Sequence, residues 1–104
     1  MAFHVWWQQH GGIGGHVWLR NEQMAAVREE MLAQGMVCGR EGGAGIALHK
    51  LETPQDSFVS EIEIEEALEA ASAEATVIED AKLWVDWLVF LEGAAKHGGL
   101  RVRP

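Results

Sequence analysis

Histidines at both ends of a glycine-rich run are the first residues whose types suggest chemistry. The run is His10-Gly-Gly-Ile-Gly-Gly-His16, and His49 follows later in the chain. Imidazole nitrogens bind transition metals, so these three histidines are the candidate metal ligands. A structural zinc site usually includes a closely spaced pair of cysteines, whereas this chain has the single Cys38. We therefore predict no bound metal and no other cofactor.

The glycine-rich run also lacks the residues that hold a nucleotide. A Walker loop needs Gly-Lys followed by Ser or Thr, which the sequence does not contain. A dinucleotide fingerprint starting at Gly12 would need a glycine where Val17 stands. Residues 11–15 are therefore predicted to be a hairpin loop.

Nucleophilic catalysis has the residue types it needs but no recognisable pattern. Cys38, His49 and Asp56 could in principle form a triad, yet a triad is a spatial arrangement that sequence spacing does not establish. A small buried hydrophobe is the commoner role of a lone cysteine. We predict no catalytic residue and a protein that is not an enzyme. The alternative is a small-molecule- or metal-dependent enzyme that uses the loop His10–His16.

Carboxylates dominate the second half of the chain. Ten acidic residues and no Lys or Arg lie between Glu52 and Asp80, and the formal net charge is −8. Glu61, Glu65 and Glu69 recur every four residues, so a helix would place them on one face, at a cost of roughly 0.2–0.5 kcal/mol per like-charged pair. These three residues are called the acidic ridge below. It is either a solvated face that keeps the protein soluble or a docking surface for a basic protein.

The charge also excludes some partners. A one-sided negative field attracts basic proteins and repels nucleic acid and anionic membrane surfaces. We expect neither of the latter as a partner. The most apolar segment, Leu83–Ala95, is interrupted by Asp86 and Glu92 and is shorter than a bilayer span. With no visible secretory signal, the prediction is a cytoplasmic protein.

Tryptophans are the second candidate for contacts with a partner. Trp6 and Trp7 are adjacent in a predicted strand, so their side chains must point to opposite faces of the sheet. One of them is then covered by another element or exposed. Together with Trp18 they are the candidate interface aromatics, and an exposed Trp on a small sheet suggests either a homodimer interface or a ligand-binding patch. Trp84 and Trp87 are predicted to lie in the core.

Three helices are predicted from apolar spacing and capping signals. The first covers about 21–34, with Asn21 as N-cap and Gly35 just past its end. The second covers about 61–74 and begins with the capping box Ser60-x-x-Glu63. The third covers about 77–97, begins with a second capping box, Thr76-x-x-Glu79, and packs across the sheet.

Strands are predicted at both ends of the chain. Phe3–Trp7 alternates and is followed by a possible hairpin partner at 17–19, and the alternating strand Leu100–Arg103 should pair with the first strand. Residues 36–57 read as an irregular connector with one short strand at 46–48. The prediction is a single α+β domain, residues 1–104, in which a small, mostly antiparallel sheet is covered by three helices.

The two ends of the chain resemble a group of bacterial proteins. The opening Phe3-His4-Val5-Trp6-Trp7 and the closing segment from Trp87 to Val102 are similar to small uncharacterised proteins encoded in GC-rich bacterial genomes. The resemblance covers about a third of the chain and implies a bacterial source, but no activity. The expected function is therefore that of a non-enzymatic acidic interaction module, which binds another protein or itself.

Overall fold

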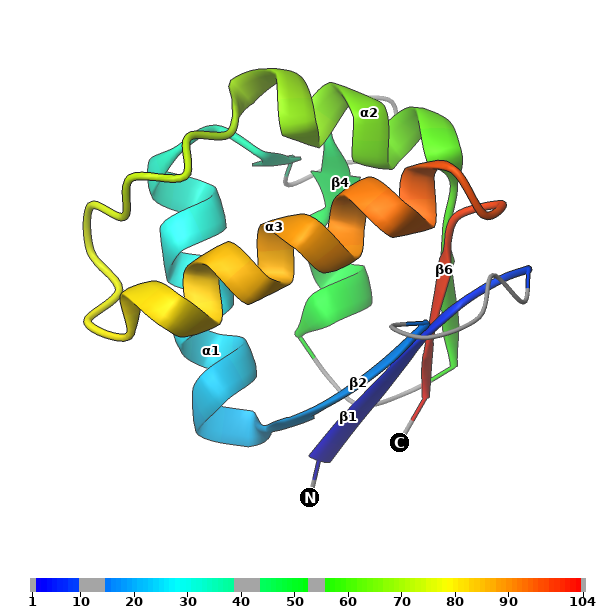
Figure 1. Cartoon of the computed structure of the whole chain (residues 1–104), viewed down its shortest axis with the longest axis horizontal. Helices are drawn as coiled ribbons and strands as arrows, with labels where there is room; N and C mark the ends of the chain where they lie inside the picture. Colours follow the sequence, from blue (N-terminus) through cyan, green and yellow to red (C-terminus); the bar gives the residue numbers. More distant parts are fainter. Residues whose placement is uncertain (1, 10–14, 39–43, 53–55, 104) are drawn as a thin grey trace.

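The computed structural model describes residues 2–9, 15–38, 44–52 and 56–103. It has the predicted α+β architecture, with a four-stranded antiparallel sheet and three α-helices in the described part (Figure 1). The elements in chain order are β1 (Ala2–Trp7), β2 (His16–Arg20), α1 (Asn21–Ala33), β3 (Val37–Cys38), β4 (Ile46–Ala47), the 3-10 helix η1 (Leu48–Leu51), β5 (Ser57–Val59), α2 (Glu61–Ala70), α3 (Ala81–Ala95) and β6 (Leu100–Arg103).

The two ends of the chain form the middle of the sheet. The strand order is β2-β1-β6-β5, and Val5 of β1 lies opposite Val17 of β2 on one side and Val102 of β6 on the other. The predicted hairpin and the predicted pairing of the two chain ends are both confirmed. The strand β5 was not predicted, because three residues are too short to show an alternating pattern. The predicted strand at 46–48 is β4, which pairs with β3 in a separate parallel sheet.

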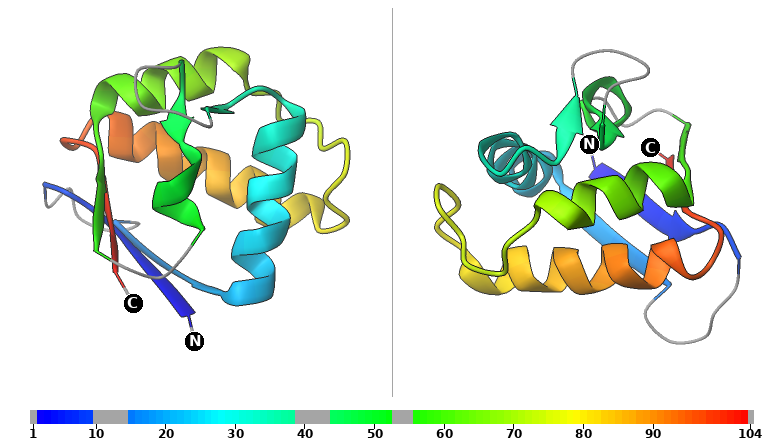
Figure 2. Two further views of the ribbon diagram at one scale, coloured as in Figure 1. Left: turned by 180° about the vertical axis from the view of Figure 1, so that it is seen from behind. Right: turned by 90° about the horizontal axis from the view of Figure 1, so that it is seen from above.

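One face of the sheet packs on the helices. Phe3, Val5 and Val102 point inward and belong to the same buried cluster as Trp84 and Leu91 of α3. The prediction that Trp84 lies in the core is confirmed, since its side chain is fully buried. In Figure 1 the sheet is seen nearly edge-on at the lower right, with the helices on one side of it, and Figure 2 shows α2 and α3 side by side. None of the helices in the described residues covers the other face of the sheet (Figure 1).

The helix boundaries differ from the prediction where distant residues take over the capping groups. The capping box of Ser60 and Glu63 forms as expected, with Ser60 Oγ accepting from Glu63 N–H at 3.2 Å. The predicted box of Thr76 and Glu79 is wrong. The N–H and hydroxyl of Thr76 donate to Glu30 of α1, and α3 begins four residues later than predicted, with Asp80 as its N-cap.

Two smaller boundary differences have hydrogen bonds as their cause, the first with distant residues and the second with a residue of the same helix. Helix α2 ends at Ala70 rather than near 74, because the N–H of Ser72 donates to the Gln34 side chain and the Ser72 carbonyl accepts from Trp84 Nε1 at 2.8 Å. Arg20, not Asn21, is the N-cap of α1, and its N–H donates to Gln23 Oε1 at 2.9 Å. Gly35 follows the helix with a φ of 75°, as the prediction requires.

Candidate functional site

The acidic ridge is exposed along α2. Glu61, Glu65 and Glu69 all have exposed side chains. Glu61 accepts a hydrogen bond from the N–H of Gly98 at 3.0 Å, which ties the start of α2 to the turn before β6. Among the described residues, Glu65 and Glu69 have no ion-pair partner. The ridge therefore presents uncompensated negative charge to solvent.

Glu63 of the same helix has a structural role instead. Its carboxylate receives Lys50 Nζ at 2.8 Å, and both side chains are about four-fifths buried, with 22% and 21% exposed. It also accepts from the backbone N–H of Ser60 at 3.1 Å. Burial alone would raise the pKa of Glu63, but hydrogen bonds from Lys50 and from the Ser60 and Ala47 N–H groups hold this pKa below its ordinary value. This carboxylate fastens α2 to η1 and is not available to a partner.

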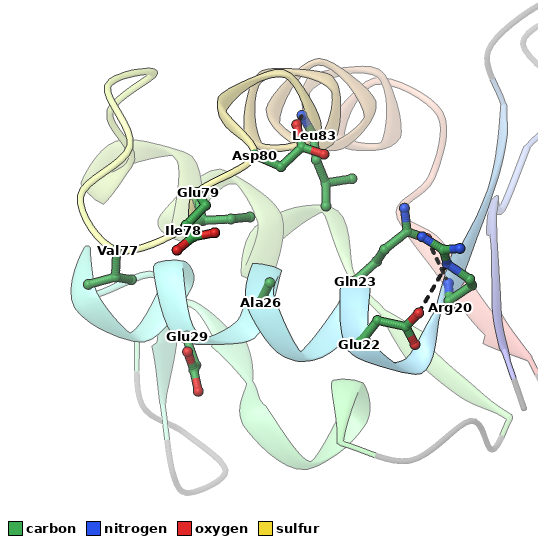
Figure 3. Close-up of a pocket in the computed structure, with 10 residues that line it drawn as sticks. All are labelled: Arg20, Glu22, Gln23, Ala26, Glu29, Val77, Ile78, Glu79, Asp80 and Leu83. Atoms are coloured by element: carbon green, nitrogen blue, oxygen red, sulfur yellow. Dashed lines mark hydrogen bonds and ion pairs between the residues drawn. The ribbon is translucent and has the colours of Figure 1, made fainter.

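A second acidic feature lies between α1 and the start of α3. It is an open groove of about 420 Å³. Its carboxylates come from Glu22, Glu29, Glu79 and Asp80, while Ala26, Val77, Ile78 and Leu83 supply apolar surface and Arg20 and Gln23 close one end. Figure 3 shows the α1 residues on one side, and on the other the segment 77–80 with Leu83. This feature is called the acidic groove below.

The carboxylates of the groove differ in how they are engaged. Glu22 pairs with Arg20 at 3.2 Å, and Asp80 accepts from the N–H of Leu83 at 3.0 Å as the N-cap of α3. Glu29 and Glu79 are exposed and have no ion-pair partner among the described residues. Val77 beside them is 55% exposed. Two unpaired negative charges next to apolar surface suit a cationic side chain that has an aliphatic stem.

The open face of the sheet carries two of the predicted interface aromatics. Trp6 is 42% exposed and Trp18 is 52% exposed. Because side chains alternate along a strand, both point away from the helices, as Phe58 of β5 and Arg101 of β6 do. We call this surface the outer face; Phe58 was not among the predicted site residues.

Trp7 lies on the opposite side of the sheet. Its Nε1 donates to the Phe90 carbonyl of α3 at 3.0 Å, and its ring stacks on His97 with centroids 4.4 Å apart. A methyl group on Gly93 would collide with this ring. Of the three predicted aromatics, Trp7 therefore holds the sheet to α3, and only Trp6 and Trp18 face solvent on the outer face.

The predicted histidines are not brought together as a metal site in the described residues. His16 lies on β2, and its Nε2 is 3.3 Å from Nδ1 of His4 on β1. Burial and the charge of His4 lower the pKa of His16. His49 is exposed on η1, and His10 lies outside the described residues. No group of three or more His, Cys, Asp or Glu side chains in the described ranges is placed to hold a metal ion.

The enzyme hypothesis is not tested by these positions. Residues 10–14 of the loop His10–His16 lie outside the described part, so only Gly15 and His16 of this loop are described. The three residues that could in principle form a triad lie on separate elements: Cys38 on β3, His49 on η1 and Asp56 just before β5. Asp56 is engaged by Arg101 at 3.2 Å.

Sequence reasoning missed the acidic groove and the partner of the buried Glu63. Glu79 and Asp80 belong to the predicted carboxylate block, but the block alone does not indicate that α1 contributes Glu29 to the same surface. The sequence does not indicate that Lys50 contacts Glu63, because the two residues belong to different elements.

Comparisons of the chain with models of protein families, with curated proteins and with solved structures found no match. None of the helices in the described residues is both long enough and apolar enough to cross a bilayer. The function is therefore inferred from the geometry of these surfaces.

Proposed function

We propose that the protein is a non-enzymatic interaction module that docks a basic segment of another protein in its acidic groove. The observation that carries this proposal is that one groove combines apolar surface with Glu29 and Glu79, two exposed carboxylates that have no ion-pair partner in the described part of the chain. A Lys or Arg side chain matches both parts, since its aliphatic stem can lie on Val77 and Ile78 while its cation meets the Glu79 carboxylate, and Glu29 can pair with a second basic residue of the same segment (Figure 3).

The acidic ridge supports the same proposal in a different way. Exposed carboxylates such as Glu65 and Glu69 give each contact little affinity, typically about 0–1 kcal/mol. Their summed field raises the rate at which a basic partner arrives. The ridge therefore steers the partner, and the groove supplies the specific contact.

A binding titration with two peptides tests the proposal. The probe is a fluorescein-labelled peptide of alternating Lys and Leu, and the control peptide replaces each Lys with Glu. Fluorescence anisotropy at about 50 and about 300 mM NaCl should show binding of the Lys peptide alone, weaker at the higher salt because the Debye length shortens. Binding that ignores salt would contradict an electrostatic dock.

Charge-matched variants separate the groove from net charge. The pair Glu29→Gln with Glu79→Gln removes both unpaired groove carboxylates and should weaken binding about three- to tenfold. The control pair Glu52→Gln with Glu92→Gln makes the same change in net charge at exposed positions outside the groove. An equal loss in both pairs would show that binding follows total charge and would refute the groove as the docking site.

A further inference from the structure

The outer face of the sheet is an aromatic surface that the proposed docking groove does not use. Its exposed aromatics come from three strands: Trp18 of β2, Trp6 of β1 and Phe58 of β5, which are 52%, 42% and 41% exposed. The fourth strand, β6, contributes Arg101 and Arg103. Scattered exposed hydrophobic residues are ordinary on a protein surface, but three large aromatics on one open sheet face mark a contact surface.

The strand register places these side chains in two rows. In one row, His16, Trp6, Arg101 and Phe58 are neighbours across the four strands. In the other row, Trp18, His4 and Arg103 are neighbours across three strands. Trp18, Trp6 and Phe58 therefore each lie beside an imidazole or a guanidinium group. Trp and Arg are the residue types enriched at the energetic centres of protein interfaces.

Contacts within the outer face fix several of these groups before any partner binds. The ring of His16 stacks on Trp6 with centroids 3.7 Å apart, and His16 Nε2 is 3.3 Å from His4 Nδ1. The Arg101 guanidinium is held by Asp56 at 3.2 Å and by Gln8 Oε1 at 3.3 Å. A surface whose side chains are already ordered loses less entropy on association.

The charge of the outer face points to a particular occupant. Arg20 and Arg101 are paired with Glu22 and Asp56, which leaves Arg103 as the one arginine of this face without an ion pair among the described residues. The face is therefore nearly neutral. A strongly cationic partner gains nothing from it, and a polyanion such as nucleic acid meets one unpaired arginine on a chain of net charge −8.

A second copy of the same face fits better. Indole rings stack on one another and on guanidinium planes, and this face carries both, so a Trp of one copy can stack on a Trp or an Arg of the other across a two-fold axis. Two-fold dimers are also the commonest symmetric assemblies. We propose that two copies of this chain associate through their outer faces, with Trp6 of the central strand β1 and Trp18 of the adjacent edge strand β2 in the contact.

Size and charge set the conditions under which this dimer forms. Four strands about 4.8 Å apart and about five residues long give a face of roughly 300 Å² in projection. A standard interface buries about 800 Å² on each partner, so the dimer is weak and forms at high protein concentration. Because two chains of net charge −8 repel each other, added salt strengthens the dimer. Salt has the opposite effect on a basic peptide in the acidic groove.

Sedimentation equilibrium on the intact chain tests the proposal. Between about 5 and about 500 µM the apparent mass should rise from 11.5 kDa toward twice that value, and the rise should be larger at about 500 than at about 50 mM NaCl. A mass that stays at 11.5 kDa at every concentration and salt overturns the proposal. A dimer that weakens with salt also overturns it, because attraction between opposite charges would then hold the copies together.

Variants locate the contact. Trp6→Ala, on the central strand β1, should raise the dissociation constant at least about tenfold, since truncation of a central aromatic is the typical hot-spot loss. The matched control is Ile62→Ala on α2, where the side chain is 70% exposed and lies off the outer face; it should change the constant less than about twofold. Equal effects of the two substitutions would place the interface elsewhere and refute the assignment.

Oxidative footprinting of the unmodified chain gives a readout that does not depend on a variant folding. Trp6 and Trp18 should be oxidised more slowly at the high protein concentration than at the low one, whereas exposed Ile62 should react equally at both. Unchanged rates at the two tryptophans would overturn the proposal. A third sample contains dilute protein with labelled oligo(dT). If the oligonucleotide protects both tryptophans from oxidation while the protein stays monomeric, the outer face is a site for single-stranded nucleic acid and the dimer proposal is overturned.

Discussion

The buried carboxylate of Glu30 should make the unfolding free energy of this protein fall at low pH, and the substitution Glu30→Gln should remove this part of the pH dependence. Glu30 of α1 is fully buried, and its oxygens accept five donors at 2.6–3.0 Å: the N–H groups of Thr76, Val77 and Ile78, the Thr76 hydroxyl and the Gln34 side chain. Burial alone would raise the pKa of Glu30. The hydrogen bonds from Ile78, Val77, Gln34 and Thr76 outweigh it and hold the pKa at about 2, against an ordinary value of 4.5.

The sign of the effect follows from this lowered pKa. The unfolded chain binds a proton to Glu30 more readily than the folded chain, so the contribution of Glu30 is complete above about pH 4.5 and is lost as the pH falls toward about 2. A difference of about 2.5 pKa units corresponds to about 3 kcal/mol of unfolding free energy. Glu30→Gln keeps the shape but turns an NH2 group toward N–H donors, so it should cost about 3 kcal/mol at pH 7.

Urea unfolding from about pH 7 to about pH 2.5 measures both quantities. The difference in unfolding free energy between the unmodified protein and Glu30→Gln should be about 3 kcal/mol at pH 7 and should shrink steadily below about pH 4.5. Glu29→Gln is the matched control, because the neighbouring carboxylate is exposed and should change stability by less than about 0.5 kcal/mol. Parallel curves for the unmodified protein and Glu30→Gln would refute the role assigned to this carboxylate.

Two further substitutions test how the sheet and α2 are held. Gly93→Ala should lower the unfolding free energy by about 1–3 kcal/mol despite the better helix propensity of Ala, because the new methyl group meets the Trp7 ring. Urea unfolding of Gly93→Ala, Trp7→Leu and the double variant should give a non-additive cycle, and additive losses would contradict the contact. Ser60→Ala should cost about 1 kcal/mol by removing the acceptor for the Glu63 N–H, whereas Ser57→Ala in β5 serves as the control; equal losses would argue against the cap.

Local patterns predicted the elements whose signals lie within the element itself. The apolar stripe of α3, the capping box at Ser60 and the alternation in β1 each depend on residues a few positions apart, and all three are present. The start of α3 was predicted wrongly because it depends on Glu30, which comes from another helix. Glu30 accepts from the Thr76 N–H that a capping box would use, and it also accepts from the Thr76 hydroxyl. No pattern near Thr76 carries that information.

For the candidate surfaces, too, local patterns predicted some features and tertiary packing decided the others. Helical spacing was enough to predict that Glu61, Glu65 and Glu69 share one face, and strand alternation was enough to predict that Trp6 and Trp7 point in opposite directions. Which of the two tryptophans faces solvent depends on where α3 packs, and the acidic groove exists because α1 and the segment 77–80 meet. Both are consequences of tertiary packing and have no signal in a short window of sequence.

The position of β6 in the sheet has a consequence for synthesis of the protein. His4 pairs with Arg103, and β6 comes after every other described element in chain order, so the second central strand is made later than all of them. Until then the nascent chain can form the hairpin of β1 and β2, but Phe3 and Val5 lack half of their neighbours, and β5 has no strand beside it. Contacts between such distant residues form slowly. Completion of this core therefore waits until β6 has been synthesised, and chaperones that bind exposed apolar strands have that interval in which to act.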